Sequence, residues 1–245
     1  MKLQFVGCGD AFGSGGRLNT CFHVRGESAN FLIDCGASSL IGLKRLDIDR
    51  NAIQAIFITH FHADHFGGVP FFLLDAQFFS RRTEPLSIVG PTGLTEWYER
   101  VMETSFPGSS RTPPKFRLTL HELGAGEQLS VAGVHAHGFQ AHHGNPGGPF
   151  LAFRLVVEGK VIAYTGDSEW TEGLVDAGYL ADLFIAEAYF FDKKVKLHLD
   201  LETLEQSLQR VRPGRLVLTH MSEEMLCRVE TLPHECAHDG LLIDV

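Results

Sequence analysis

Thr59-His60-Phe61-His62-Ala63-Asp64-His65, directly after the apolar segment 52–58, is the stretch that decides the fold of this chain. It places three imidazoles and a carboxylate at the end of a predicted strand. Both groups bind divalent ions such as zinc. His60 and His62 alternate and can reach one ion, whereas Asp64 and His65 turn toward a second. The alternative is a His-rich surface turn, but we interpret the stretch as the core of a metal site.

Three later segments also end a predicted strand in a side chain suited to metals. A lone His or Asp after a strand is more often a cap or a solvated turn than a ligand. Functional side chains in α/β folds nevertheless gather at the carboxyl ends of strands. The repetition therefore predicts one shared site. The segments are Phe139-Gln140-Ala141-His142-His143-Gly144, the run from Val161 to Asp167, and the run from Arg215 to His220.

The rest of the chain alternates short apolar runs with helical periodicity. Predicted strands cover 2–6, 21–24, 31–34, 55–59, 86–89, 116–121, 129–137, 151–157, 161–164, 183–186 and 215–218. Predicted helices cover 38–46, 94–104, 201–211 and 221–230. Strands followed by helices in each half predict an α/β fold, an αββα four-layer sandwich of two mixed sheets packed face to face with helices outside. We expect one domain, 1–245, whose pseudo-symmetric halves meet near 105–130.

Composition restricts the class of protein, its partners and its cellular location. Of 245 residues, 44% are hydrophobic and 21% are charged, which is typical of a globular domain. The net charge of −9 argues against a broad basic surface for nucleic-acid backbones. No run resembles a signal peptide or reaches the length of a membrane span. The number of cysteines is odd and they are widely spaced, which indicates free thiols rather than disulfides. We therefore expect a soluble cytoplasmic protein without a membrane partner. These cysteines are Cys8, Cys21, Cys35, Cys227 and Cys236.

The motifs together resemble the metallo-β-lactamase-fold superfamily of binuclear metallohydrolases. Within it, the chain is most similar to the tRNA 3′-processing endoribonucleases (tRNase Z) and their phosphodiesterase relatives. The resemblance covers nearly the whole chain, and its HxHxDH core is highly specific. The matching segments are 5–11, 31–36, 59–68, His143, Thr165-Gly166-Asp167, Glu187-Ala188 and Thr219-His220.

The resemblance implies two metal ions, expected to be Zn²⁺, although Mn²⁺ or Fe accepts the same ligands. It places His60, His62 and His143 on one ion. It places Asp64, His65 and His220 on the other, with Asp167 bridging the two. His142 is the alternative to His143, because the insertion-like segment 144–149 makes the alignment with the family motif ambiguous at this position. Two such ions lower the pKa of a bridging water, so the implied reaction is attack by a metal-bridging hydroxide. Asp64 is also expected to hydrogen-bond this nucleophile.

Two further residues gain a catalytic role from the resemblance. The segment Leu183–Phe190 looks like the HEATF segment of tRNase Z enzymes, and His198 matches the histidine of their HxT element. By resemblance, Glu187 orients His198, and His198 assists at the scissile phosphate and the leaving oxygen. The alternative is that His198 is a solvent-facing histidine before the helix 201–211.

Departures from the family bear on the substrate. Processing tRNase Z enzymes usually carry a basic arm, whereas the segment 105–115 supplies only Arg111 and Lys115 as charges. We therefore expect a small organic or cyclic phosphodiester, with nucleic acid less favoured. The alternatives are tRNA 3′ processing, hydrolysis of a carboxylic ester, thioester or lactone on the same metals, and a metal-binding scaffold or regulatory protein without turnover. The sequence does not decide whether the protein is a homodimer. Five phenylalanines suit a dimer face, a substrate pocket or the core: Phe66, Phe71, Phe72, Phe78 and Phe79.

Overall fold

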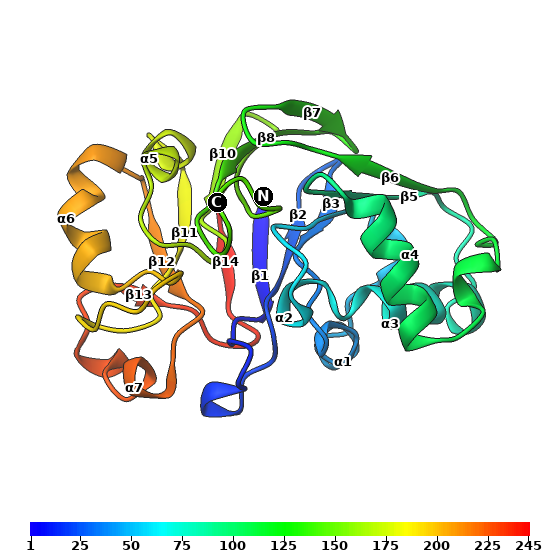
Figure 1. The fold of residues 1–245 in the computed structure, drawn as a ribbon, viewed down its shortest axis with the longest axis horizontal. Coiled ribbons are helices and arrows are strands. Elements are labelled where there is room, and N and C mark those ends of the chain that lie inside the picture. The colour runs from blue at the N-terminus through cyan, green and yellow to red at the C-terminus, as the bar shows by residue number, and fades with distance from the viewer.

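A computed structural model describes all 245 residues, and its strands form two mixed seven-stranded sheets. The first has the order β14-β1-β2-β3-β4-β5-β6, and the second has the order β13-β12-β11-β10-β9-β8-β7 (Figure 1). The first contains β1 (Lys2–Gly7), β2 (Cys21–Arg25), β3 (Asn30–Ile33), β4 (Ala55–Phe57), β5 (Leu86–Gly90), β6 (Leu118–Glu122) and β14 (Leu242–Asp244). The second contains β7 (Gln128–Val131), β8 (Val134–Gln140), β9 (Leu151–Val157), β10 (Lys160–Tyr164), β11 (Leu183–Glu187), β12 (Leu216–Thr219) and β13 (Glu235–Cys236).

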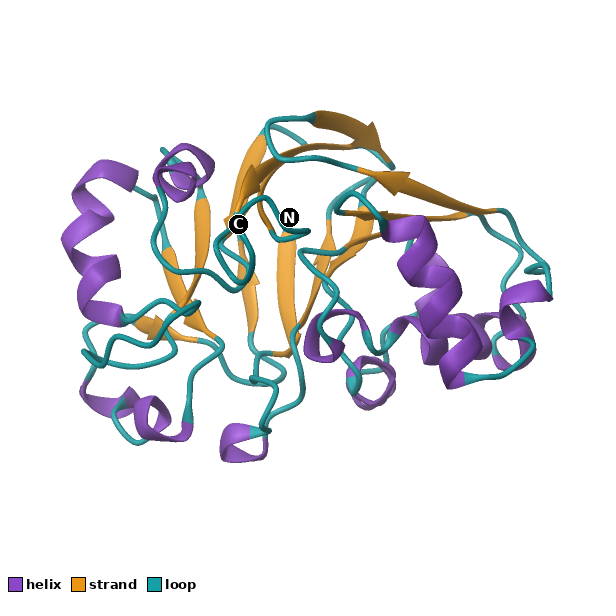
Figure 2. Cartoon of the chain, in the orientation of Figure 1, coloured by secondary structure: helices purple, strands orange, loops and turns teal.

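Helices lie on the outer side of each sheet, which confirms the predicted αββα sandwich (Figure 2). Beside the first sheet are α1 (Ser39–Arg45), α2 (Ala63–Phe66), α3 (Val69–Leu74), the π-helix η3 (Asp75–Phe79) and α4 (Leu94–Ser105). Beside the second are α5 (Glu172–Gly178), α6 (Leu201–Val211) and α7 (Glu223–Leu226). The 3-10 turns are η1 (Ser14–Gly16), η2 (Arg50–Ala52), η4 (Ser109–Arg111) and η5 (Val229–Thr231). None of these helices combines the length and the apolar character that crossing a membrane requires.

Three apolar clusters hold the layers together. The largest lies between the sheets, where aromatic rings meet edge to face. The ring centroids of Phe5 and Phe22 are 4.9 Å apart, and those of Phe22 and Tyr164 are 5.1 Å apart. A second cluster fills the space beneath α1, α3 and α4, and a third packs α6 and α7 on the other sheet. Strands such as β4 and β11 are therefore buried on both faces, which explains their uninterrupted apolar sequences.

Two sequence predictions of secondary structure were wrong. The predicted strand 129–137 is two strands, β7 and β8, which pair through Val131 and Val134. The two intervening residues, Ala132 and Gly133, both have positive φ (51° and 76°), the geometry of a tight hairpin turn. The predicted helix 221–230 is reduced to the four residues of α7 and the turn η5. Helices α2, α3 and α5 and strands β13 and β14 were not predicted.

A carboxylate links the two sheets at one end of the sandwich. Glu158 occupies the β9–β10 hairpin turn, while residues 27–29 form the turn between β2 and β3. The carboxylate of Glu158 accepts hydrogen bonds from the backbone N–H groups of Glu27 (2.9 Å), Ser28 (2.8 Å) and Ala29 (3.2 Å). These bonds favour the ionised form and lower the pKa of Glu158 to about 2.

We expect Glu158→Gln to lower the melting temperature of the protein by a few degrees at neutral pH, because an amide accepts these hydrogen bonds less strongly. A carboxylate with a depressed pKa stabilises the folded state above its ordinary pKa, and this contribution is lost as the pH falls through the folded-state value. The difference between wild type and variant should therefore shrink between pH 5 and pH 2, as measured by thermal denaturation. Glu27→Gln is the matched control, since it removes the same charge from an exposed neighbour. An equal effect of both variants would contradict the role of Glu158.

Candidate metal centre and active site

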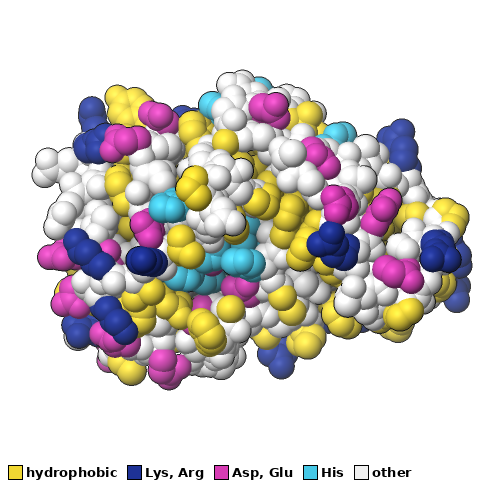
Figure 3. Space-filling model, in the orientation of Figure 1, with side chains coloured by type: hydrophobic (Ala, Val, Ile, Leu, Met, Phe, Trp, Pro, Cys, Tyr) yellow, Lys and Arg dark blue, Asp and Glu magenta, His cyan; other side chains and the backbone are white.

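The candidate ligands follow the carboxyl ends of strands. His60 and His62 lie in the loop after β4, and His143 follows β8. Asp167 follows β10 and His220 follows β12. Because β10, β11 and β12 are parallel neighbours, their carboxyl ends meet at one edge of the second sheet. Histidine side chains gather at the centre of the face shown in Figure 3.

Close backbone packing holds the His-rich loop in place. His62 is the N-cap of α2, a single turn that carries Asp64 and His65. The segment after β3 packs against it, since the N–H of Cys35 donates to the carbonyl of His65 (2.7 Å). A Cβ at Gly36 would lie 2.1 Å from the carbonyl oxygen of Asp64, so only glycine permits this approach.

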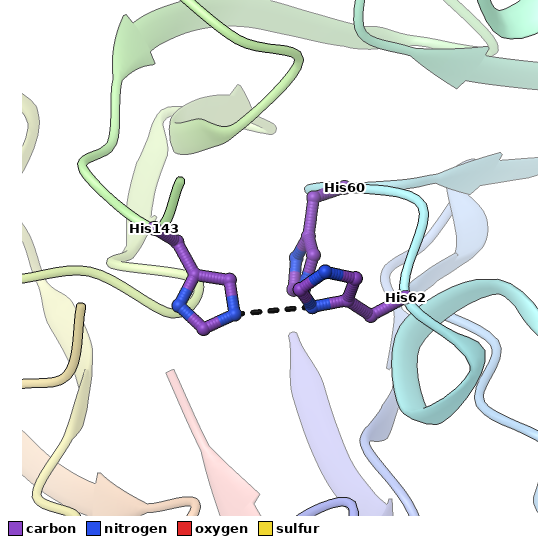
Figure 4. Close-up of side chains that lie close together, drawn as sticks. All are labelled: His60, His62 and His143. Atoms are coloured by element: carbon purple, nitrogen blue, oxygen red, sulfur yellow. Dashed lines mark hydrogen bonds between the residues drawn. The ribbon is translucent and has the colours of Figure 1, made fainter. Parts of the chain in front are cut away.

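The first group consists of His60, His62 and His143, whose nearest ring nitrogens face one another (Figure 4). Nδ1 of His143 donates to the carbonyl of Leu197 (2.7 Å), which directs Nε2 toward Nδ1 of His62 (3.1 Å). Nε2 of His60 is buried and has no hydrogen-bond partner. Burial and the neighbouring His65 lower the pKa of His60, which keeps its imidazole neutral. Imidazole nitrogens that converge in this way fit a zinc-type ion.

The second group consists of Asp64, His65, Asp167 and His220. Nδ1 of His65 is bonded to the buried carboxylate of Asp34 (2.7 Å), which directs Nε2 toward Asp167 Oδ1 (3.2 Å). Nε2 of His220 lies 3.3 Å from Oδ2 of Asp64. This arrangement of nitrogen and oxygen donors also fits a divalent ion.

Asp167 lies between the two groups. Its Oδ2 is 3.6 Å from Nε2 of His143 in the first group and 3.4 Å from Nε2 of His220 in the second. Its Oδ1 is buried and faces Nε2 of His65 (3.2 Å). Gly166, directly before it, has a φ of +59°, and a Cβ there would lie 2.8 Å from the carbonyl oxygen of Leu151. The turn that aims Asp167 at both groups therefore requires glycine.

Charges within the second group are strongly coupled. Burial alone would lower the pKa of His220, but Asp167, Asp64 and Glu187 raise it to about 10. Burial opposes ionisation of Asp64, yet hydrogen bonds from His220 and His65 hold the pKa of its carboxyl well below its usual range. Imidazolium and carboxylate groups thus balance one another. A cation that binds here takes the place of these protons.

The buried Glu187 and the partly exposed His198 form a pair beside the second group. Nδ1 of His198 lies 2.5 Å from Oε1 of Glu187, while Oε2 of Glu187 accepts from the backbone N–H groups of Ser168 (3.0 Å) and Leu199 (3.2 Å). Burial would lower the pKa of His198, but the bonded Glu187 raises it. Its side chain is 21% exposed, and its ring stacks on Tyr189 with centroids 4.5 Å apart. The pair therefore presents an oriented proton donor to the site.

The structure distinguishes alternatives that the sequence left open. His143 belongs to the first group, whereas the side chain of His142 is 45% exposed and lies 3.6 Å from Glu169. Asp34 and Tyr189, which hold His65 and His198, were not assigned roles from the sequence. Asp34 did offer a signal, since it also ends a predicted strand. Tyr189 offered none.

Comparisons with known proteins extend along the whole chain. Residues 1–233 match the family described as anti-Pycsar protein Apyc1. Ribonuclease Z of Agathobacter rectalis is 28% identical over 268 residues, which cover 89% of this chain and 86% of that protein. The crystal structure of human tRNase Z, short form, is similar with a TM-score of 0.81 and 26% identity, and covers 100% of this chain and 99% of its own. The metallo-β-lactamase fold protein YhfI from Bacillus subtilis has a TM-score of 0.78 at 18% identity, with 99% of both chains covered. The similarity therefore includes both sheets as well as the His-rich loop.

Proposed function

The chain belongs to the family of the anti-Pycsar protein Apyc1, and we propose that it is a binuclear metal-dependent hydrolase of a small phosphodiester. The predicted resemblance to metallo-β-lactamase-fold enzymes of the tRNase Z and phosphodiesterase branch is confirmed by its relatives, which are hydrolases. One observation carries the proposal. Asp167 lies between two groups of side chains that could each hold a metal ion, and it lies directly beside the Glu187–His198 pair.

The two groups of nitrogen and oxygen atoms support an assignment of the metal ligands. In our proposal His60, His62 and His143 hold one ion, and Asp64, His65 and His220 hold the other, with Asp167 shared. We propose zinc, because imidazole and carboxylate ligands suit it, although manganese or iron would accept the same set. When bound, a pair of such ions lowers the pKa of water and stabilises negative charge on a phosphoryl group.

The protein's own side chains supply the remaining chemistry. His198 donates its proton to the leaving oxygen, and Glu187 keeps the imidazole oriented and charged. Asp64 accepts a hydrogen bond from the attacking water while it serves as a ligand. Tyr189 stacks on the face of the His198 ring, and Glu187 hydrogen-bonds to its Nδ1. These two contacts hold the proton donor in a single orientation.

The surroundings of the site favour a small substrate such as a cyclic phosphodiester. Between β5 and β6 the chain forms only α4 and the short turn η4, without an extended basic arm. The net charge of −9 also opposes a long contact with a phosphate backbone.

Processing of RNA is the second candidate, and two observations favour it. The curated relatives include ribonuclease Z enzymes. In addition, a cavity of 290 Å³ beside His198 is lined by Lys194 and Lys196, which suit a phosphate. A precursor tRNA with a 3′ trailer tests this candidate, since specific cleavage at the 3′ end of the mature sequence would favour it.

We expect zinc reconstitution to load two ions per chain, as measured by elemental analysis of the purified protein. The loaded protein should hydrolyse bis(p-nitrophenyl) phosphate but not carboxylic esters, thioesters or lactones, and chelation should remove the activity. Fewer than two ions per chain would contradict the binuclear assignment. Turnover of carboxylic esters alone would replace the phosphodiester proposal, and no turnover of any ester by the metallated protein would favour a metal-binding scaffold.

The homodimer and the cytoplasmic location stay predictions. Phe66 and Phe72 are buried in the core, whereas Phe71, Phe78 and Phe79 are exposed on α3 and η3. Sedimentation of the wild type and of a Phe79→Ser variant tests whether this surface joins two copies.

A further inference from the structure

A cavity of 350 Å³ opens beside His62, between the candidate metal centre and α4. Three aromatic side chains line it, Phe61, Trp97 and Phe150. The sequence motif accounts for His62, but the proposed chemistry uses none of these rings.

The rings form flat apolar walls close to the proposed metal ligands. Phe61 stacks on Trp97 with centroids 5.5 Å apart and an interplanar angle of 15°. Phe150 lies 5.9 Å from the ring of His62 and 5.5 Å from the ring of His143. A group bound against these rings would therefore lie close to a phosphate held at the two histidines.

Charge in this cavity does not favour a phosphate. The guanidinium of Arg100 lies 5.8 Å from the centre of the Trp97 ring and is paired with Glu96 (2.8 Å). The first N–H groups of α4 are also occupied, because Gly93 and Thr95 donate to the carboxylate of Glu122 (3.0 and 3.1 Å). The cavity thus offers flat aromatic surfaces and a neutralised cation, which suit an uncharged planar ring.

The position of the cavity identifies which part of the substrate it faces. The ring of His143 stands between its two neighbours, 4.9 Å from the ring of His62 and 4.8 Å from the ring of His198. In the proposed function the leaving oxygen lies at His198. The aromatic cavity lies at His62, so it faces the ester arm that stays on phosphorus.

We propose that Phe61, Trp97 and Phe150 form a specificity subsite for a planar aromatic group, such as a nucleobase, on the retained arm of the phosphodiester. This inference rests on the proposed function and adds to it a preference for one class of phosphodiester substrate. Stacking of one ring against aromatic walls changes binding by about five- to tenfold. The subsite therefore selects among phosphodiesters, whereas the metal centre and His198 perform the reaction.

Two substrates with the same leaving group test the subsite. Bis(p-nitrophenyl) phosphate and methyl p-nitrophenyl phosphate both release p-nitrophenolate and differ only in the retained arm. We expect Trp97→Leu to lower the aryl-to-methyl ratio of kcat/KM by about five- to tenfold, with the methyl ester unaffected. Trp97→Phe should keep most of the preference. Phe78→Leu, an exposed aromatic residue in a different cavity, is the matched control.

The outcomes are distinguishable. An unchanged ratio, or an equal loss on both substrates in a folded, fully metallated Trp97→Leu protein, would overturn the subsite while leaving the proposed function intact. If wild type hydrolyses neither substrate, the proposed function fails. Because Trp97 also packs in the core beneath α4, a measurement without variants is needed as well. The product p-nitrophenyl phosphate should inhibit wild type about five- to tenfold more strongly than methyl phosphate, and equal inhibition would contradict the inference.

Discussion

Asp167→Ala is expected to reduce kcat/KM for phosphodiesters by about a thousandfold or more and to lower the metal content below two ions per chain. Asp167 is the carboxylate whose oxygen lies within 3.6 Å of His143 and 3.4 Å of His220, so its loss affects both groups. It also removes the negative charge that raises the pKa of His220 and His65. Steady-state kinetics and elemental analysis of the same preparation measure the two effects.

A surface variant provides the control for this prediction. Asp47→Asn removes the same charge at an exposed position with positive φ, which asparagine tolerates. It should retain full activity and metal content. Two ions per chain together with wild-type turnover in Asp167→Ala would remove Asp167 from the metal centre and with it the observation that carries the proposed function.

His198→Ala is expected to lower kcat by about a hundred- to ten-thousandfold on a phosphodiester with an alkoxide leaving group, with the metal content unchanged. An alkoxide needs a proton as it departs, whereas p-nitrophenolate is stable without one. The loss should therefore be much smaller on bis(p-nitrophenyl) phosphate. Comparison of the two substrates separates proton donation from a merely structural role, which would reduce both rates equally.

His135→Ala is the matched control, since His135 is an exposed histidine bonded only to Gln128 and Ser130. It should leave both rates unchanged. An equal loss on both substrates in His198→Ala would contradict the assignment of His198 as the proton donor. A loss of metal in this variant would instead indicate that His198 is a metal ligand. Such a role is compatible with its position, because it lies close to Asp167, Glu187 and His220.

The sequence predicted the fold class because the strands are apolar and short, and because helical periodicity is clear at 94–104 and 201–211. Its failures have local physical causes. The turn between β7 and β8 consists of only two small residues, Ala132 and Gly133. The apolar pattern continues across it, so the sequence predicted one strand instead of a hairpin. The short helices α2 and α3 are stabilised by packing under the first sheet rather than by an extended periodic pattern.

The candidate site was predictable to the extent that it is local. His60, His62, Asp64 and His65 are neighbours along the chain, so their spacing alone indicated a metal loop. The choice between His143 and His142 depends on the carbonyl of Leu197, which is distant in sequence. The aromatic cavity combines Phe61, Trp97 and Phe150 from three separate segments, and no spacing within any one segment indicates it.

The division of the candidate ligands between the two sheets has a consequence for the lifetime of the protein. His60 and His62 extend from the first sheet, whereas His143, Asp167 and His220 extend from the second. An ion held by both sets would act as a cross-link across the sandwich and would stabilise the folded state against separation of the sheets. Metal-free chains would open across this seam more often and be cleaved sooner by proteases. The supply of metal would then set how long each molecule survives, in addition to whether it is active.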